Sequence, residues 1–330
     1  MFGQRLKPKS GVTSHACVGV LLVLMLCTAG GCRWNQWFQK NASEPPPVLF
    51  TALPSREEAV AAINANSGRI QSLQTQGATA SVPGFPAIGA EIAIEKPKNF
   101  RFRAGTALLG PELDMGSNSL LFWFWAARAP EPNVYFARHD LFAASRARQM
   151  LPIEPTWLIE ALGVVEIDPA TILEGPIKAG EDRVQIKTTL QASAGQFTRL
   201  VHFHGKHGWI LEQHLYDERN QLVASARSSN HHYYHLDGVS LPKRIEVSVP
   251  QGQLQFQLDI SEWRINQPPA EGQVLFELPR TQLANQRFVD MADPNFVPPG
   301  GTLPVEGPSP RVSQAPAPRP EDRYRGFSLR

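Results

Sequence analysis

Cysteine is almost absent from this chain of 330 residues. Its three cysteines, Cys17, Cys27 and Cys32, all lie within the first 32 residues. The rest of the chain therefore has no disulfide bond and no thiolate metal site. Such a domain must be stabilised by its own core, and a chain of this length with 42% hydrophobic residues can build one.

The sequence also lacks an excess of basic residues. There are 32 lysines and arginines against 30 acidic residues, and three of the basic ones, Arg5, Lys7 and Lys9, lie in the N-terminal segment. Without that segment the chain carries 29 basic and 30 acidic residues. Proteins that bind nucleic acids usually carry a basic stripe or patch. We therefore expect no nucleic-acid partner.

Motifs of the common enzyme classes are missing as well. The chain has neither a phosphate-binding Gly-rich loop nor a dinucleotide fingerprint, and Ser117 does not lie in a nucleophile elbow. Glu112 and Asp114 are near one another but alternate with apolar residues, as positions on one strand do. We expect neither catalysis nor a cofactor.

The first 32 residues have the organisation of an export signal. A basic start precedes the apolar run 16–27, which is short for a membrane span, and small residues follow. Small residues directly before Cys32 resemble a bacterial lipobox, in which the cysteine is diacylated and becomes the N-terminus. Ala29 stands where a lipobox usually has Leu. A plain secreted protein cleaved nearby and an uncleaved anchor are the alternatives.

Lipidation at Cys32 would anchor the chain stably, because two or more acyl chains are attached there. Arg33 is not the Asp that retains such proteins in the inner membrane of enteric bacteria, which favours the outer membrane. Residues 33–54 are expected to be a tether, with an extended Pro45–Pro47 segment. The expected location is the bacterial cell envelope, facing the periplasm.

The stretch 110–140 predicts three strands separated by turns at 116–118 and 130–133. The segment LLFWFWA at 120–126 is apolar on both faces: Leu121, Trp123 and Trp125 share one, and Leu120, Phe122 and Phe124 share the other. One face can fill a core. The other face must meet a covering element, a ligand or a membrane.

The rest of the body predicts a meander of short strands. A capping box at Ser55 and Glu58 begins a helix at about 56–70. The segment 140–180 is expected to lack strands and to hold a short helix near 154–162, and 281–296 is expected to add another. Residues 297–330 include eight prolines and are expected to be disordered. Strands are expected at 76–82, 88–95, 99–104, 183–190, 197–204, 209–216, 222–228, 232–236, 243–249, 253–260 and 274–279.

The predicted fold class is mainly β, a curved antiparallel sheet that forms an unclosed β-barrel of about 11 strands with covering helices, because an open sheet of that size must curl. The expected organisation is a signal peptide at 1–32, a tether at 33–54, the sheet domain at 55–280 and a C-terminal extension at 281–330.

Several segments follow one known pattern in order: the N-terminal helix with SLQTQGATASV, the strand EKPKNFRFRA, then GPELDMGSNSLLFWFW and the late VLFELP. Over about 55–280 they resemble the LolA/LolB/LppX superfamily of periplasmic lipid and lipoprotein carriers. The resemblance implies a half-barrel and a helical lid around an apolar cavity that takes acyl chains. LolB-type carriers are themselves lipoproteins, which agrees with Cys32. The candidate cavity residues are Phe100, Phe102, Leu121, Phe122, Trp123, Phe124, Trp125 and Trp157.

The histidines permit another interpretation. His202 and His204 share one strand face, and two such imidazoles can bind one metal ion. Histidines on a solvated face of antiparallel strands explain the same pattern. Similarly, Arg101 and Arg103 are expected on a solvated face, where they would meet either water or lipid headgroups.

The sequence thus supports three hypotheses. The first is an envelope lipoprotein that binds a lipid acyl chain or a lipidated protein, with a possible role in transport. The second is a structural envelope lipoprotein without a ligand, whose C-terminal tail contacts another envelope protein. The third is a metal site on the histidine-rich strands.

Overall fold

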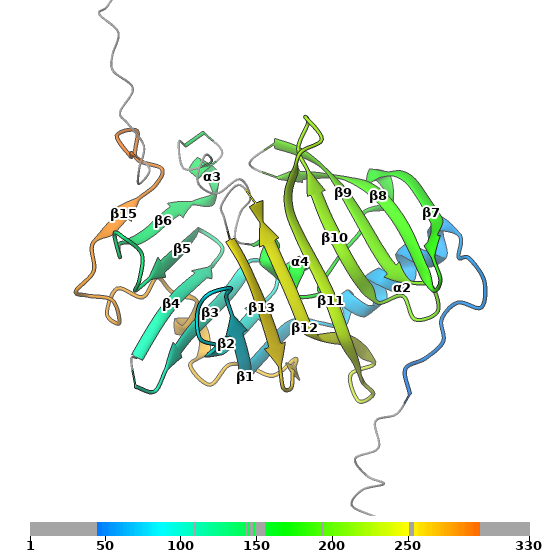
Figure 1. Cartoon of the computed structure of the whole chain (residues 1–330), viewed down its shortest axis with the longest axis horizontal. Helices are drawn as coiled ribbons and strands as arrows, with labels where there is room; N and C mark the ends of the chain where they lie inside the picture. The colour runs from blue at the N-terminus through cyan, green and yellow to red at the C-terminus, as the bar shows by residue number, and fades with distance from the viewer. Residues whose placement is uncertain are drawn as a thin grey trace, which may run out of the picture.

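The computed structural model describes residues 45–108, 110–142, 144–145, 148, 156–192, 195–250 and 254–297. The expected signal peptide, Cys32, most of the tether and the tail from 298 onward lie outside these residues. The described residues form one large sheet with a few short helices (Figure 1).

Fifteen strands form this sheet in the described part of the chain. Most strands pair antiparallel with the strand that follows them, and short turns join them. The strands are β1 (Ser72–Ser81), β2 (Ile88–Glu95), β3 (Asn99–Thr106), β4 (Gly110–Ser117), β5 (Leu121–Ala126), β6 (Val134–Arg138), β7 (Ile172–Gly180), β8 (Arg183–Ala192), β9 (Gly195–His204), β10 (Ile210–Tyr216), β11 (Leu222–Tyr234), β12 (Val239–Val249), β13 (Leu254–Ile260), β14 (Arg264–Ile265) and β15 (Phe288–Asp290).

The sheet is curved and unclosed, because its outermost strands β15 and β7 do not pair with each other (Figure 1). β1 joins the two halves of the chain, since Ala78 is opposite Ala90 of β2 on one side and Ile260 of β13 on the other. The predicted fold class, a mainly β, curved and unclosed sheet with covering helices, is confirmed. The strands number fifteen instead of about eleven.

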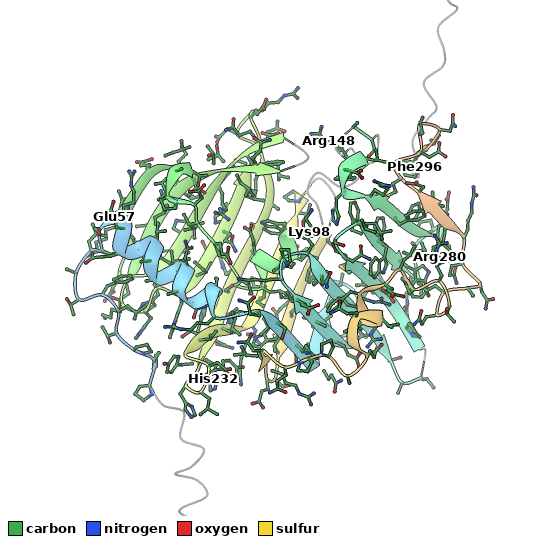
Figure 2. All side chains as sticks on the ribbon, turned by 180° about the vertical axis from the view of Figure 1, so that it is seen from behind. Glu57, Lys98, Arg148, His232, Arg280 and Phe296 are labelled. Carbon is green, nitrogen blue, oxygen red and sulfur yellow. The ribbon has the colours of Figure 1, made fainter. Side chains whose placement is uncertain are left out.

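Helix α2 (Arg56–Gly68) begins at the predicted capping box. The Ser55 Oγ accepts a hydrogen bond from the Glu58 N–H at 3.2 Å, and the Glu58 carboxylate accepts one from the Ser55 N–H at 2.8 Å. Val60 and Ile63 pack in a cluster with apolar residues of β8, β9 and β10. Figure 2, seen from the opposite side to Figure 1, shows α2 lying across these strands. The helix therefore defines the inner face of that half of the sheet.

The segment 140–180 contains more structure than the sequence predicted. It includes α3 (His139–Phe142), α4 (Trp157–Ala161) and the 3-10 helix η2 (Pro169–Thr171). The helix expected near 154–162 is thus present as α4. The expectation of no strand was wrong, because β7 begins at Ile172. Pro176 is tolerated there since β7 is an edge strand and needs ladder partners on one side only.

Three further predictions were wrong. The strands expected at 222–228 and 232–236 are one strand, β11, because β12 pairs with it across the polar residues between them. Residues 272–276, expected to be a strand in part, form the 3-10 helix η4 (Gly272–Phe276). Residues 281–296 form turns and β15 instead of a helix. β15 pairs in parallel with β6.

The largest core cluster lies between the inner face of β1–β4 and β10–β13 and helix α4, which contributes Trp157 and Ile159. Among the described residues, no helix is both long enough and apolar enough to cross a membrane.

Candidate functional site

The aromatic strand β5 is covered on both faces by the chain itself. On the inner face, Phe122 packs with Phe142 of α3 and with Phe296. On the outer face, Trp123 and Trp125 pack with Leu283 of the C-terminal segment. The outer face of β5 is therefore covered by a segment of the same chain that lies about 160 residues further along the sequence.

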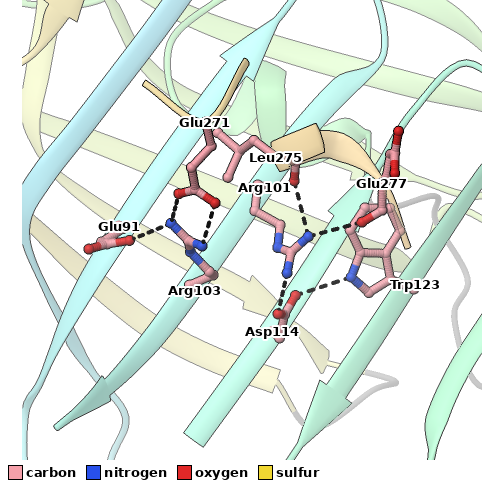
Figure 3. Close-up of polar contacts among 8 residues, drawn as sticks. All are labelled: Glu91, Arg101, Arg103, Asp114, Trp123, Glu271, Leu275 and Glu277. Atoms are coloured by element: carbon pink, nitrogen blue, oxygen red, sulfur yellow. Dashed lines mark hydrogen bonds and ion pairs between the residues drawn. The ribbon is translucent and has the colours of Figure 1, made fainter. Parts of the chain in front are cut away.

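A buried ion pair fixes this C-terminal cover (Figure 3). Arg101 contacts Asp114 at 2.5 Å and donates hydrogen bonds to the carbonyl oxygens of Leu275 at 3.0 Å and Glu277 at 3.1 Å. The Trp123 Nε1–H donates to the other oxygen of Asp114 at 3.1 Å. Burial lowers the pKa of Arg101, and the charge of Asp114 opposes that shift.

The expectation of a solvated face for Arg101 was wrong. Only 4% of the residue is exposed, because η4 and the residues after it lie over it. Arg103, two residues along the same strand, is partly exposed and forms ion pairs with Glu91 and Glu271. Alternation of charged and aromatic residues identified the two faces of β3 correctly, but it carried no information about a distant segment covering one of them.

The inner aromatic residues Phe100 and Phe102 lie beneath α4. The void that remains there, between them and Leu158 and Leu162 of the α4 segment, has a volume of only about 10 Å³. This part of the interior is therefore packed. Of the eight aromatic and aliphatic residues proposed from the sequence as cavity residues, only Trp157 lines the large cleft described next.

A cleft with a volume of about 820 Å³ opens among the described residues. It lies between the β2–β3 turn and the β4–β6 region on one side and strands β8–β10 on the other, and α4 forms part of its wall. Its apolar lining residues are Leu120, Trp157, Ile159, Val164, Leu190, Phe197 and Leu215. Its polar and charged lining residues are Lys96, Lys98, Ser119, Arg138, His139, Asp140, Thr156, Glu160, Glu166 and Gln191.

The α4 wall is held by polar contacts from the inner face of the sheet. Arg199 of β9, of which 2% is exposed, contacts the Glu160 carboxylate at 2.7 Å and donates a hydrogen bond to the carbonyl oxygen of Glu166 at 3.0 Å. The Gln213 side-chain amide donates to the carbonyl oxygen of Glu160 at 2.8 Å. From α2, the Ser67 hydroxyl donates to the carbonyl oxygen of Val165 at 2.6 Å.

The charges at the cleft are nearly balanced. Lys96 pairs with Glu166 at 2.5 Å, and Arg138 pairs with Asp140 at 2.6 Å. The hydrogen bond and charge of Arg138 lower the pKa of Asp140. Lys98 is exposed and has no ion-pair partner among the described residues. Figure 2 shows it near the middle of the molecule, between the two halves of the sheet. Lys98 is thus the cation that an anionic group entering the cleft can neutralise.

The sequence analysis missed most of these cleft residues. Phe197 and Leu215 alternate on ordinary strands, and Lys98 belongs to an ordinary turn. Leu120 was included in the aromatic stretch, and its 68% exposure distinguishes it from the buried residues that follow it.

The two histidines of β9 belong to separate groups. His204 packs against His207 and Trp209 near the β9–β10 turn. His202 lies instead near His214 and Glu212 of β10. His202 and His204, proposed together from the sequence as a metal pair, therefore belong to different groups. The sequence also gave no reason to include Glu212, because the pairing of two strands brings it there.

Burial, followed by the charge of Arg183, lowers the pKa of His202. Burial acts to raise the pKa of Glu212, but hydrogen bonds and charge from Arg183 outweigh it, and the pKa is lowered. The group therefore contains an ionised carboxylate beside two histidine side chains.

No family model and no curated protein matches the chain. Similar solved structures include a domain described as an outer membrane lipoprotein-sorting protein from Vibrio parahaemolyticus, with 12% identity and a TM-score of 0.45 over 68% of this chain and 100% of that one. A DUF1329 family protein from Desulfovibrio piger has 13% identity and a TM-score of 0.44 over 67% and 96%. A LolA superfamily protein from Nitrosomonas europaea has 12% identity and a TM-score of 0.40 over 66% and 97%.

Proposed function

We propose that this protein binds an amphiphile with an acyl chain and an anionic head, either a lipid or a lipidated protein, without breaking bonds in it. The observation that carries the proposal is the cleft of about 820 Å³, whose lining includes apolar side chains and Lys98, a lysine that has no ion-pair partner among the described residues. Clefts of about 300–1,000 Å³ with mostly apolar walls and a few polar groups are typical of small-molecule sites.

The two kinds of lining residue suit the two ends of such a ligand. Leu120, which is 68% exposed, and the partly exposed Leu190 offer an apolar surface, and each methylene group that they remove from water contributes about 0.8 kcal/mol. Lys98 offers a positive charge to the head. A hydrophilic metabolite would leave the apolar surface without a matching partner, so an amphiphile is the better fit.

The proposal places this binding module at the bacterial envelope. The support is the sequence before the described residues, where a signal segment ends in small residues and Cys32. Lipidation there would hold the domain at a membrane, facing the periplasm and with an outer-membrane location, on the tether 33–54. Transfer of the ligand between the domain and a membrane is a possible consequence of this arrangement.

The proposal is tested by native mass spectrometry and lipid extraction on the chain produced without its first 32 residues. We expect a co-purifying lipid that is lost in Leu120→Glu, because this exposed residue lines the cleft. Leu236→Glu is the matched control, since Leu236 is 88% exposed and lies in the β11–β12 turn, outside the cleft lining. An apo mass for the parent protein, or equal lipid loss in both variants, would contradict lipid binding.

A second candidate function is a structural envelope lipoprotein without a ligand. The observation that favours it is the packing of both faces of β5 by α3 and the C-terminal segment, with little space beneath α4. In this case the tail from 297 onward would contact another envelope protein. Capture of one defined envelope protein by the tail alone, together with a ligand-free cleft, would support this function.

A further inference from the structure

A row of polar side chains crosses three strands, β8, β9 and β10, on the face opposite α2. The strand register places Gln185 of β8 opposite His202 of β9, and His202 opposite Glu212 of β10. His214 is two residues beyond Glu212 and therefore shares its face. In Figure 1, α2 lies behind these strands, and no helix crosses them on the near side. Sheet pairing thus assembles two imidazoles and one carboxylate from two adjacent strands.

The nitrogen and oxygen atoms of these three side chains converge on one point. His202 Nδ1 is 3.6 Å from Glu212 Oε2, and His214 Nε2 is 3.4 Å from the same oxygen. The three potential ligand atoms all lie within 4.8 Å of one another. Only 13%, 12% and 25% of the side chains of His202, Glu212 and His214 is exposed. The site is therefore compact and largely shielded, which distinguishes it from a chance group of surface histidines.

One further contact indicates which His202 atom is available. His202 Nε2 lies 3.2 Å from the Gln185 side-chain oxygen, which can only accept a hydrogen bond, so Nε2 carries the proton. His202 Nδ1 then presents a lone pair toward a carboxylate. This buried atom has no hydrogen-bond partner in the described structure. His202 Nδ1 is thus an acceptor that has no donor of its own and faces a carboxylate oxygen, and a cation between these two atoms would satisfy it.

We propose that His202 Nδ1, His214 Nε2 and Glu212 Oε2 bind a divalent late transition-metal ion such as zinc. Two imidazoles and one carboxylate are a ligand set that zinc uses, whereas calcium and magnesium require mostly oxygen ligands. Gln185 would fix the orientation of the His202 ring by accepting the hydrogen bond from its Nε2–H. The inference goes beyond the proposed lipid binding, because it uses none of the cleft residues.

Two arginines near the site set a limit on its affinity. Arg183 contacts Glu212 Oε2 at 2.5 Å, and Arg227 contacts Glu212 Oε1 at 2.8 Å. Each carboxylate oxygen has two lone pairs, so Oε2 can accept from Arg183 and still bind a metal ion. The positive charges nevertheless oppose a second cation. We therefore expect weaker zinc binding than in a structural zinc site.

The test uses zinc itself with the full-length chain in detergent, in which Cys17, Cys27 and Cys32 are replaced by serine so that no thiolate competes for it. Isothermal titration calorimetry measures stoichiometry and Kd. The principal variant is His214→Gln, and Gln185→Leu is a second one that keeps all three ligands. The matched control is His204→Gln, which removes a histidine of the other group on β9. Thermal melting with and without zinc checks the fold of each protein.

The proposal predicts one zinc ion per chain and a zinc-dependent rise of Tm in the parent protein. His214→Gln should weaken binding by more than tenfold, and Gln185→Leu by about tenfold or more, while His204→Gln leaves Kd unchanged. A crystal of the parent protein with zinc should show anomalous density between His202, Glu212 and His214. Absence of zinc binding, density at His204 and His207 instead, or loss of binding in His204→Gln would overturn the proposal.

Discussion

Arg199 on β9 and Glu160 on α4 form an ion pair of 2.7 Å beneath the wall of the cleft. The arginine is almost fully buried, whereas the glutamate side chain is 27% exposed at the cleft. The same guanidinium also bonds Thr188 and the carbonyl oxygen of Glu166. This one side chain thus ties α4 and the segment after it to the sheet, and it determines the shape of one side of the cleft.

Replacement of Arg199 by leucine should loosen the α4 segment. Glu160 would lose its partner and the carbonyl oxygen of Glu166 its donor, so we expect a loss of about 2–3 kcal/mol of unfolding free energy, less than for a fully buried pair because Glu160 is partly exposed. Hydrogen exchange should accelerate in residues 158–167. Lys206→Leu, which breaks an exposed pair with Asp182, should have a much smaller effect on stability. Equal urea midpoints for both variants would refute the role given to Arg199.

The Arg101–Asp114 pair should matter far more than the neighbouring pairs of Arg103. Asp114→Asn leaves a buried guanidinium without a counter-charge, and we expect a loss of about 3–5 kcal/mol in urea denaturation. Arg103→Gln, two residues away on β3, removes partly exposed pairs and should cost about 1 kcal/mol or less. Asp114→Asn should accelerate hydrogen exchange in η4, whereas Arg103→Gln should not. The account of the C-terminal cover fails if the two substitutions have similar effects.

Gly116 is required by the close approach of Trp123. A Cβ at this position would overlap the indole ring and lie 2.8 Å from the carbonyl oxygen of Phe100. We expect Gly116→Ala to destabilise the protein by about 1–3 kcal/mol through overpacking. At Gly89 the nearest atom to a Cβ would be the carbonyl oxygen of Gly105 at 3.6 Å, so Gly89→Ala should be tolerated. Thermal melting of both variants measures the difference, and a stable Gly116→Ala would contradict this packing.

His231 should make stability depend on pH. Burial lowers its pKa from 6.5 to about 4, against the hydrogen bond that its Nε2–H donates to the Ile210 carbonyl oxygen. As pH falls from 6.5 toward 4, the unfolded state binds a proton first, so stability is lost across that window. The full effect is at most about 3 kcal/mol. Urea titrations from pH 7 to 4 should show a smaller loss in His231→Gln, and an identical loss in both proteins would contradict the assignment.

Local signals predicted the elements that depend on neighbouring residues. Ser55 and Glu58 are three residues apart, and their capping box begins α2 where expected. The two apolar faces of β5 could also be predicted from the sequence, because side chains alternate along a strand. The segment that covers Trp123 could not be predicted. Leu283 and η4 lie about 150 residues further along the chain, and no feature of their sequence indicates where they pack.

The cleft and the histidine site could not be predicted from the sequence for the same reason, because each is built from residues on different segments of the chain. Lys98 and Leu215 line one cleft because the sheet brings the β2–β3 turn and β10 to either side of α4. His202 was recognised in the sequence by its spacing from His204, but strand register pairs it with Glu212 instead. A local spacing rule finds residues on one strand, whereas both sites are built from several strands.

Photo-crosslinking shows directly whether an acyl chain binds in the cleft. A fatty acid with a diazirine near its methyl end is incubated with the chain lacking residues 1–32, irradiated, and the adducts are located by peptide mass spectrometry. We expect adducts at Trp157, Leu190 and Phe197, which line the cleft, and their loss in Leu120→Glu but not in Leu236→Glu. Adducts spread over exposed residues such as Leu236, with none on the cleft residues, would contradict it.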